Sequence, residues 1–397
     1  MGAAMTPTRR EVLVSGGAIA AGSTFTSIAE TRAGSAVDAS KADSNSEPLC
    51  LTDFEPLAKA KIPPMGWEYM TAGAADELTL KWNSEAYQRL RLKPRILVDV
   101  SRLDTSIVLL GRQHSVPILL APVASHKLYH PEGEIATVRG ASSADVTLVV
   151  TTPASTSLED VAAAAKTPLW FQVYVQRDRD FTRALIQRAE KAGYQALCLT
   201  VDSPVFGARN REERAHVKYP GLPNLQGLKD SQAGVYLAKG QDIYSPISDP
   251  TVTWKTIEWM RSVTKLRIVA KGVLNPDDAE LAIKSGVSAI IVSNHGGRNL
   301  DTLPPSIDVL PSVADKVAKR IPVLVDGGIR RGTDVLKALA LGANAVLIGR
   351  PYIWGLGVDG EAGVTKVVNI LRREFATAMA LTGRTNIASI DRSLIWS

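Results

Sequence analysis

The sequence is short of several features that mark particular classes of protein. It has 2 cysteines in 397 residues, too few for a disulfide framework, and Cys198 sits in an apolar, strand-like run that predicts a buried, inert thiol. The net charge of +6 is spread without a dense run of lysine and arginine, so a nucleic-acid surface is not indicated. Internal repeats and low-complexity segments are also missing. With 45% hydrophobic and 22% charged residues, the composition is that of an ordinary globular protein.

Long apolar stretches are lacking as well. The mild apolar segment Val12–Ala21 is too short and too interrupted by glycine to span a bilayer, so we expect no integral membrane segment. It follows Arg9-Arg10 and precedes Arg32, and thus resembles a twin-arginine export signal. We predict an export signal over residues 1–36, a polar linker over residues 37–48, and a periplasmic or secreted protein that is exported folded. The alternative is a disordered tail that carries two arginines by chance.

Short apolar runs alternate with amphipathic stretches through the rest of the chain. Eight runs predict strands that are buried on both faces: Pro117–Ala124, Thr147–Thr151, Trp170–Val175, Ala196–Val201, Ile268–Lys271, Ala289–Ser293, Pro322–Asp326 and Ala345–Ile348. Helices are predicted over Glu134–Ala144, Leu158–Ala165, Phe181–Ala192, Trp254–Val263, Pro276–Ser285, Ile307–Ala318, Gly332–Leu341 and Gly363–Leu381. This order favours an α/β fold, a single TIM (β/α)8 barrel over residues 49–397, with a doubly wound sheet as the fallback.

Two segments fall outside this alternation. Leu49–Ser101 is predicted to be a mostly helical N-terminal cap on the barrel. Ser203–Val252 is one long irregular connection, rich in glycine, proline and aspartate. A connection of this length in a compact barrel is usually a functional loop or is partly disordered.

The stretch Ile291–Asp301 changes abruptly from apolar residues to polar residues and glycine, as a barrel strand does where it delivers chemistry at its carboxyl end. His295 can take a proton near neutral pH, and Arg298 can hold a carboxylate through two parallel hydrogen bonds. Gly296 and Gly297 would let the backbone approach a flat ring. A lone His295 would more often cap a strand, but the residues at the other strand ends favour an active site.

The carboxyl ends of the strands form the active site in such barrels, so their residues can be collected into one constellation. It comprises Ala121, Pro122, Val123, Ala124, Thr151, Thr152, Gln172, Tyr174, Thr200, Asp202, Lys271, Ser293, Asp326, Gly327, Gly328, Arg330, Gly349 and Arg350. The glycine turns after the last two strands, with Arg330 and Arg350, predict a phosphate cradle and hence a phosphorylated cofactor. Lys271 requires an anionic partner. This is either an acidic residue in a structural ion pair or the polar edge of a flavin that gains electrons.

Four further residues each allow a functional and a structural interpretation. Asp202 can orient the imidazole of His295 across the barrel mouth, or it can cap the turn that it begins. Arg209 is close enough in sequence to return over the same opening, although surface charge is the better interpretation of it alone. Tyr69 and Tyr174 fit a role in the site and plain aromatic packing equally well.

Three motifs, Ser293–Asp301, Asp326–Asp334 and Ile348–Pro351, resemble the signatures of the FMN-dependent L-2-hydroxy-acid oxidase and dehydrogenase family. Glycolate oxidase, lactate oxidase and the flavin domain of flavocytochrome b2 belong to this family, and the resemblance runs from about Leu49 to the C-terminus. It implies FMN as cofactor and oxidation of an L-2-hydroxy acid to the 2-keto acid, with oxygen, a quinone or a cytochrome as electron acceptor. We also expect a homotetramer or a larger assembly.

The resemblance also implies a role for each residue. His295 would be the base, assisted by Asp202, while Arg298, Arg209 and Tyr69 bind the substrate carboxylate and Tyr174 bonds its reacting end. For FMN it implies the Ala121–Ala124 backbone and Thr151 or Thr152 at the ring, Gln172, Thr200 and Lys271 along the polar edge, and Gly328, Arg330, Gly349 and Arg350 at the phosphate. Pro153 stands where glycolate oxidases carry Trp, which favours lactate or a somewhat larger 2-hydroxy acid.

Two other functions fit part of this pattern. A type 2 isopentenyl diphosphate isomerase would share the phosphate cradle, but it has no need for His295, Arg298 and Arg209 around a 2-hydroxy carboxylate. A non-catalytic flavin-binding protein would hold FMN that no hydroxy acid reduces.

Overall fold

Eight parallel strands close into a barrel in the computed structural model, which describes residues 47–228 and 247–396. The predicted export signal and nearly all of the linker lie outside the described residues. The strands are β4 (Ile118–Leu120), β5 (Leu148–Thr151), β6 (Leu169–Val173), β7 (Ala196–Thr200), β8 (Arg267–Lys271), β9 (Ala289–Val292), β10 (Val323–Asp326) and β11 (Ala345–Ile348). Because β11 pairs with β4, the ring is closed and the predicted TIM (β/α)8 barrel is confirmed.

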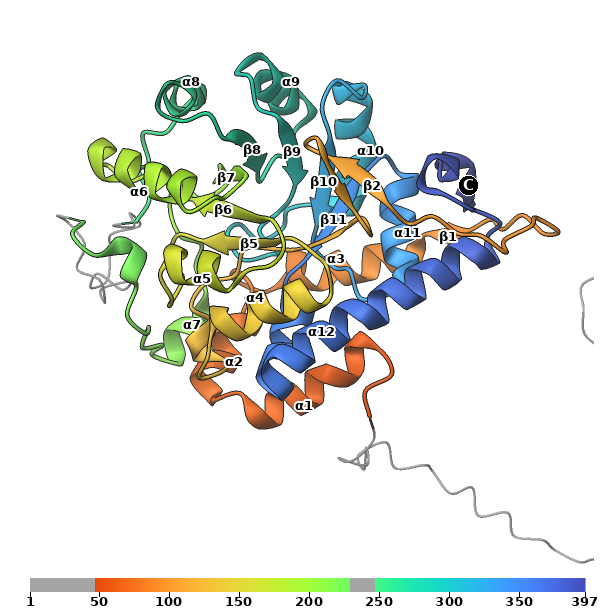
Figure 1. Ribbon diagram of the computed structural model, residues 1–397, viewed down its shortest axis with the longest axis horizontal. Helices are drawn as coiled ribbons and strands as arrows, with labels where there is room; N and C mark the ends of the chain where they lie inside the picture. Colours follow the sequence, from red (N-terminus) through yellow and green to blue (C-terminus); the bar gives the residue numbers. More distant parts are fainter. Residues whose placement is uncertain (1–46, 229–246, 397) are drawn as a thin grey trace, which may run out of the picture. The chain divides into compact units, whose positions relative to one another are not determined.

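The strands are apolar on both faces because each face meets a different core. Leu119, Val149 and Leu324 belong to the cluster inside the barrel, whereas their neighbours Leu120 and Val150 pack in the larger cluster with the surrounding helices. Figure 1 shows the strands in the middle of the ring of helices. Cys198 lies inside the barrel, and burial raises the pKa of its thiol to about 12, so the predicted inert thiol is confirmed.

The helices of the barrel are α4 (Glu134–Ser143), α5 (Leu158–Ala164), α6 (Arg179–Lys191), α8 (Trp254–Val263), α9 (Pro276–Lys284), α10 (Ser306–Val317), α11 (Gly332–Ala340) and α12 (Arg350–Leu381). The last predicted helix, Gly363–Leu381, is confirmed as the second half of α12, but the first half, which begins at Arg350, was not predicted. The backbone of α12 leaves helical geometry at Asp359 and Gly360, and Gly355 meets Gly363 so closely that a Cβ on either would clash with the other. Glycines usually disfavour a helix, but here they allow the two halves of α12 to pack closely on either side of a kink.

The N-terminal cap is helical only as far as Arg89. It consists of the 3-10 turn η1 (Leu51–Asp53) and helices α1 (Phe54–Lys61), α2 (Pro64–Thr71) and α3 (Leu78–Arg89). The prediction of a mostly helical cap is thus confirmed. Beyond Arg89 the chain is not helical, because β1 (Arg91–Leu92) pairs with β12 (Ile395–Trp396) and Pro94 then disfavours a helix.

A hairpin that the sequence did not predict closes the other end of the barrel. Strands β2 (Ile107–Leu109) and β3 (Arg112–His114) place Leu109 in the interior cluster of the barrel. Arg267, the first residue of β8, donates to the carbonyl of Leu110 in the hairpin turn. The hairpin therefore plugs the amino ends of the strands and leaves the carboxyl ends for the site.

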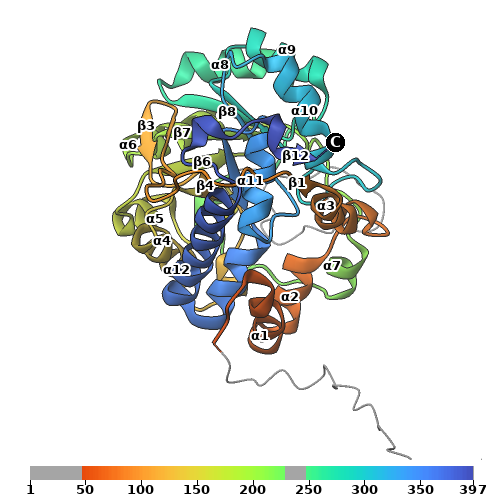
Figure 2. The same ribbon diagram turned by 90° about the vertical axis from the view of Figure 1, so that its right-hand side faces the viewer.

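The long connection after β7 returns over these carboxyl ends. It contains the short helix α7 (Asn210–Arg214) and the 3-10 turn η3 (Pro223–Leu225), and residues 229–246 lie outside the described part. Arg211 of α7 bonds Glu68 of α2, and Figure 2 shows these two helices side by side. None of the helices in the described residues is long and apolar enough to cross a bilayer.

Candidate active site

A cavity of about 440 Å³ lies at the carboxyl ends of the strands. All but three of the predicted site residues line it, from Ala121 after β4 round to Arg350 after β11. The three exceptions, Asp202, Thr152 and Ser293, stand directly behind lining residues. The Thr152 hydroxyl donates to the carbonyl of Gln172 over 2.7 Å, and the Ser293 hydroxyl accepts from Lys271 over 3.2 Å. These three residues therefore support the residues of the cavity wall and do not themselves line the cavity.

His295 stands on a strained turn directly after β9. Its φ is +57°, in the left-handed region that side chains other than glycine rarely adopt, and Gly296 and Gly297 follow at +64° and +73°. Such an outlier points to a functional position. A Cβ on Gly297 would come within 2.6 Å of the Leu80 backbone, so this glycine is required by packing against α3 and not by a ring. Gly296 does line the cavity.

The imidazole of His295 is held by Asp202. Its Nδ1 lies 2.9 Å from Asp202 Oδ1, and a carboxylate can only accept, so Nδ1 carries the proton and Nε2 is the free base. Burial lowers the pKa of His295, aided by the cation of Lys271, and outweighs the opposing effect of Asp202. His295 is therefore neutral at pH 7 and able to accept a proton.

Two neighbours of Asp202 were not predicted from the sequence to be site residues. The Ser203 hydroxyl donates to Asp202 over 3.0 Å, and the Asn299 amide donates to the Ser203 hydroxyl over 2.6 Å. Burial would raise the pKa of Asp202, but the charges of His295 and Lys271 and the hydrogen bonds from His295 and Ser203 bring it below its usual value. Asp202 thus stays charged, as the stabilisation of a protonated His295 requires.

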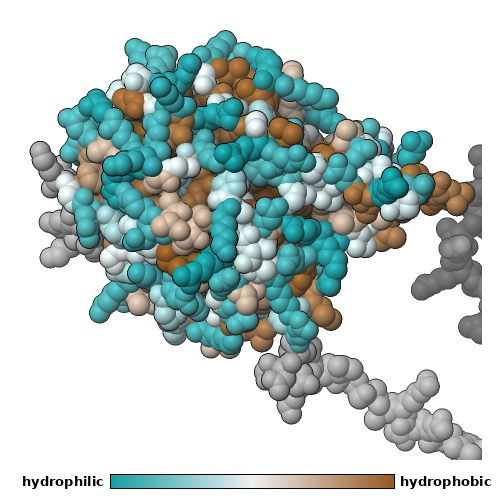
Figure 3. Space-filling view, in the orientation of Figure 1, coloured by the Kyte–Doolittle hydropathy of each residue, from teal (hydrophilic) through white to brown (hydrophobic). Residues whose placement is uncertain are grey.

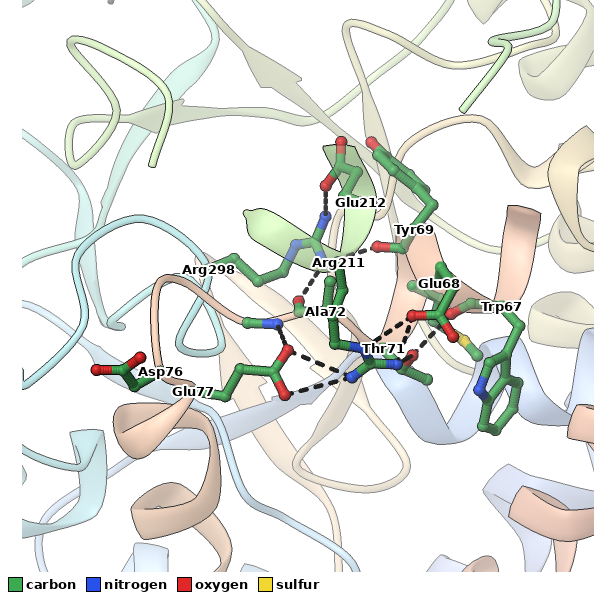
Figure 4. Close-up of polar contacts among 12 residues, drawn as sticks. Trp67, Glu68, Tyr69, Thr71, Ala72, Asp76, Glu77, Arg211, Glu212 and Arg298 are labelled. Carbon is green, nitrogen blue, oxygen red and sulfur yellow. Dashed lines mark hydrogen bonds and ion pairs between the residues drawn. The ribbon is translucent and has the colours of Figure 1, made fainter. Parts of the chain in front are cut away.

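The two arginines predicted to bind the carboxylate lie beside each other. Arg298 Nη1 donates to the carbonyls of Tyr69 over 2.7 Å and Ala72 over 2.6 Å, so the cap fixes its orientation (Figure 4). Arg209 Nε donates to the carbonyl of Arg298 over 3.0 Å. Both guanidinium groups also donate to Glu212, which the sequence analysis missed. The three-residue spacing of Arg209 and Glu212 at a helix start is a signal that could have found it.

Lys271 has its anionic partner within the protein. Its ammonium lies 3.5 Å from Asp326 Oδ2. Burial opposes the charge, but the carboxylates of Asp326 and Asp202 outweigh it and raise the pKa of Lys271. The structural ion pair considered from sequence is thus present, and it places a permanent positive charge in the wall of the cavity.

The glycine turns after β10 and β11 border an electropositive end of the cavity. Arg350 is the first residue of α12, where helix N–H groups favour an anion. Burial, together with Arg298 and Arg330, lowers the pKa of Arg350 to about 9, and its buried Nη2 has no partner among the described residues. A Cβ on Gly349 would meet Val123 and Ala121 only at ordinary van der Waals distance, whereas Gly328 is required by contact with Asn83 of α3. Buried cations with an unused donor are the environment that a phosphate needs.

These features fit FMN along its whole length. The phosphate matches the end formed by Arg330, Arg350 and the α12 N-terminus. Asp326 Oδ1, a buried acceptor without a partner among the described residues, suits the hydroxyls of a ribityl chain. Thr151, Gln172 and Lys271 supply polar groups along the wall where a ring would lie. The described residues contain no cluster of His, Cys, Asp and Glu arranged to hold a metal.

Comparison with known proteins agrees with this geometry. A family model described as FMN-dependent dehydrogenase matches residues 58–397. The chain is 43% identical over 364 residues to an L-lactate oxidase of Nostoc sp., covering 88% of this chain and 98% of that protein. It is 45% identical over 352 residues to a 2-hydroxyacid oxidase of Dictyostelium discoideum, covering 88% and 90%. A solved structure of mandelate oxidase with benzoyl-formic acid has a TM-score of 0.78 and 38% identity, covering 87% of this chain and 97% of that one.

Proposed function

Because the chain belongs to the FMN-dependent dehydrogenase family, we propose that it oxidises a short L-2-hydroxy acid of the lactate type to the 2-keto acid. The observation that carries this proposal is the convergence of a neutral His295 with Arg298 and Arg209 on one cavity that fits FMN. The isomerase considered from sequence is set aside, since the match is to the dehydrogenases over most of the chain.

The chain's own residues have separate tasks in this reaction. Arg298 and Arg209 bind the substrate carboxylate, and His295 Nε2 takes the proton that leaves the substrate. Asp202 then stabilises the protonated imidazole. Burial raises the pKa of Tyr69 to about 12 and also raises that of Tyr174, so both phenols stay protonated and can donate hydrogen bonds to the substrate. FMN, when bound, accepts the two electrons.

The experiment that tests this function is anaerobic mixing of the FMN-loaded protein with a panel of L-2-hydroxy acids. The flavin should bleach with L-lactate and not with D-lactate. We propose oxygen as acceptor, supported by the relatives named oxidases, so readmitted oxygen should restore the colour and yield one peroxide per flavin. Flavin that bleaches but is not reoxidised by oxygen would indicate a quinone or a cytochrome. Flavin that no hydroxy acid bleaches would indicate binding without catalysis and refute the proposal.

Pro153 is proposed to leave room for the substrate side chain, because it lines the cavity. Replacing Pro153 with Trp should lower kcat/KM for L-2-hydroxy-4-methylpentanoate relative to glycolate by at least about tenfold, since a few lost apolar contacts cost about 1–3 kcal/mol. Steady-state kinetics with both acids measures this ratio. Pro153→Ala is the control and should leave it nearly unchanged. If the ratio of the two kcat/KM values is the same in Pro153→Trp as in the native protein, the side chain of the substrate does not lie next to Pro153.

We propose a homotetramer or larger assembly, on the evidence of an exposed apolar arm, Ile96–Val98. Leu97 is fully exposed and Ile96 is 81% exposed. The loop after β1 projects from the body at the right of Figure 1, and its tip is apolar in Figure 3. Exposed apolar patches of this kind mark association surfaces. Sedimentation should give a tetramer or larger species for the native chain and a smaller, still yellow one for Leu97→Asp. A monomeric native chain would contradict the proposal.

Export through the twin-arginine route is likewise a proposal, supported by Arg9-Arg10 before the apolar segment. Replacing both arginines with lysine keeps the charge and should abolish export, so that the FMN-loaded protein stays in the cytoplasm. Fractionation of a bacterial host with flavin absorbance as the marker measures this. Arg32→Lys serves as the control. Equal amounts of native protein and double variant outside the cytoplasm would argue against the route.

A further inference from the structure

Glu212 occupies a position between the two substrate-binding arginines that the mechanism above does not explain. It belongs to α7, and its side chain is 13% exposed. A single oxygen, Oε2, accepts from Arg209 over 3.1 Å and from Arg298 over 3.2 Å, while Oε1 accepts from the Tyr219 hydroxyl over 2.7 Å. Figure 4 shows Glu212 directed at Arg298 from α7. A carboxylate of the protein therefore contacts both groups that are to hold the carboxylate of the substrate.

Glu212 is charged in this setting. Burial would raise its pKa, but Arg209 and Arg298 outweigh burial and bring the pKa below its usual value. Two guanidinium groups and one carboxylate leave this part of the cavity with a single net positive charge. A monocarboxylate neutralises that charge, whereas a dicarboxylate leaves an excess negative charge in a buried place, which is unfavourable.

The other charged residues of the cavity are engaged elsewhere. Lys271 pairs with Asp326. Arg350 is near enough to Arg298 for that cation to lower the pKa of Arg350, but Arg330 and Arg350 lie at the glycine turns, where the phosphate of FMN would offset their charges. Glu213, the neighbour of Glu212, lines the cavity but is exposed, so water screens its charge. The charge next to the bound carboxylate is thus set by Arg209, Arg298 and Glu212.

The arginines keep donors for a ligand while they hold Glu212. Each guanidinium has five N–H groups. Among the described residues, Arg298 uses three of them, on Tyr69, Ala72 and Glu212, and Arg209 uses two, on Arg298 and Glu212. Glu212 therefore does not have to leave when a substrate carboxylate arrives.

We propose that Glu212 is a specificity-determining residue that offsets one of the two arginines, so that the site accepts 2-hydroxy monocarboxylates and rejects dicarboxylates. This rests on the proposed function, in which Arg209 and Arg298 bind the substrate carboxylate. A residue that only fixed the arginines in place would affect both kinds of acid alike. Charge offset affects the dianion more, because the Coulomb energy scales with the charge of the ligand.

The test compares propionate with malonate, acids of equal carbon number with one and two charges. Their Kd values are measured at pH 8 on the FMN-loaded full chain, from the change in flavin absorbance. The native protein should bind malonate more weakly than propionate. In Glu212→Gln the ratio of the malonate Kd to the propionate Kd should fall at least about tenfold, because the dianion gains twice as much from the loss of a negative charge as the monoanion does.

Two variants serve as controls. Glu212→Asp keeps the charge and should keep the ratio, even where a shifted position weakens both acids. Glu68→Gln removes one negative charge from α2, where Glu68 bonds Arg211 and neither substrate arginine, and should also keep the ratio. An equal ratio in Glu212→Gln and the native chain would overturn the inference.

The native protein alone also gives a decisive result if Glu212→Gln does not fold. Malonate that binds the native chain as tightly as propionate would overturn the charge offset, with the proposed function intact if L-lactate still bleaches the flavin. If neither acid perturbs the flavin and L-lactate fails to bleach it, the proposed function fails and the inference fails with it.

Discussion

Replacing His295 with Gln is expected to slow flavin reduction by L-lactate at least about a thousandfold, within the range for loss of a general base. The Gln amide can still bond Asp202, which lies 2.9 Å from the imidazole, but it cannot take a proton. FMN binding should persist, because the phosphate end is formed by other residues. Stopped-flow absorbance under anaerobic conditions measures the reduction rate, and the yellow colour reports the bound cofactor. Near-native reduction by the variant would remove His295 from the mechanism.

The pH dependence of the native enzyme provides a control on this result. Burial lowers the pKa of His295 below its usual 6.5, so the neutral base predominates above that lowered value. The acid limb of kcat/KM should therefore lie below pH 6.5, with activity lost as the pH falls through it. Since Asp202 raises the pKa of His295, Asp202→Asn should move the limb to still lower pH. A native limb above pH 6.5 would contradict this assignment.

Replacing Arg298 with Lys should lower kcat/KM about a hundredfold, because disturbing a buried, hydrogen-bonded charge commonly costs about 3 kcal/mol. Arg298 contacts Tyr69, Ala72 and Glu212 at once, and a lysine ammonium has neither the reach nor the planar fork to keep these bonds and grip a carboxylate. The Kd of propionate should rise in parallel. Steady-state kinetics and flavin absorbance measure the two quantities.

Arg211 supplies a matched control for this substitution. It lies in the same region, but it bonds Glu68 and Glu77 on the cap and is 37% exposed (Figure 4). Because exposed ion pairs contribute at most about 1 kcal/mol, Arg211→Lys should change kcat/KM by less than about fivefold. If kcat/KM falls equally in Arg298→Lys and Arg211→Lys, the loss comes from a disturbed packing of α7 and not from weaker binding of the substrate carboxylate.

The barrel could be predicted from sequence because its strands are apolar on both faces. The run Ala345–Ile348 is an example. Its residues pack alternately inside the barrel and against the helices, so all of them are apolar and the strand appears in the sequence as one unbroken apolar run. The strand ends then locate the site, since all parallel strands deliver their next residues to one rim. This is how His295, Lys271 and Arg350, far apart in the chain, could be assigned to one cavity.

Features that depend on contact between distant segments could not be predicted. Asp301 belongs to the central motif, yet its carboxylate accepts from the backbone of Thr79 and Leu78 at the start of α3. Gly297 and Gly328 are required by that same helix and not by the cofactor. The first half of α12 was missed because its glycines pack against each other across a kink. Each of these roles is set by a neighbour that the local sequence does not reveal.

A crystal structure of the chain with FMN and pyruvate would show whether His295, Arg298 and Arg209 converge on the substrate beside the flavin. We expect the pyruvate carboxylate on Arg298 and Arg209, its keto group facing His295 Nε2, and the FMN phosphate at Arg330 and Arg350. Pyruvate bound away from His295, or a phosphate at another end of the cavity, would contradict this arrangement.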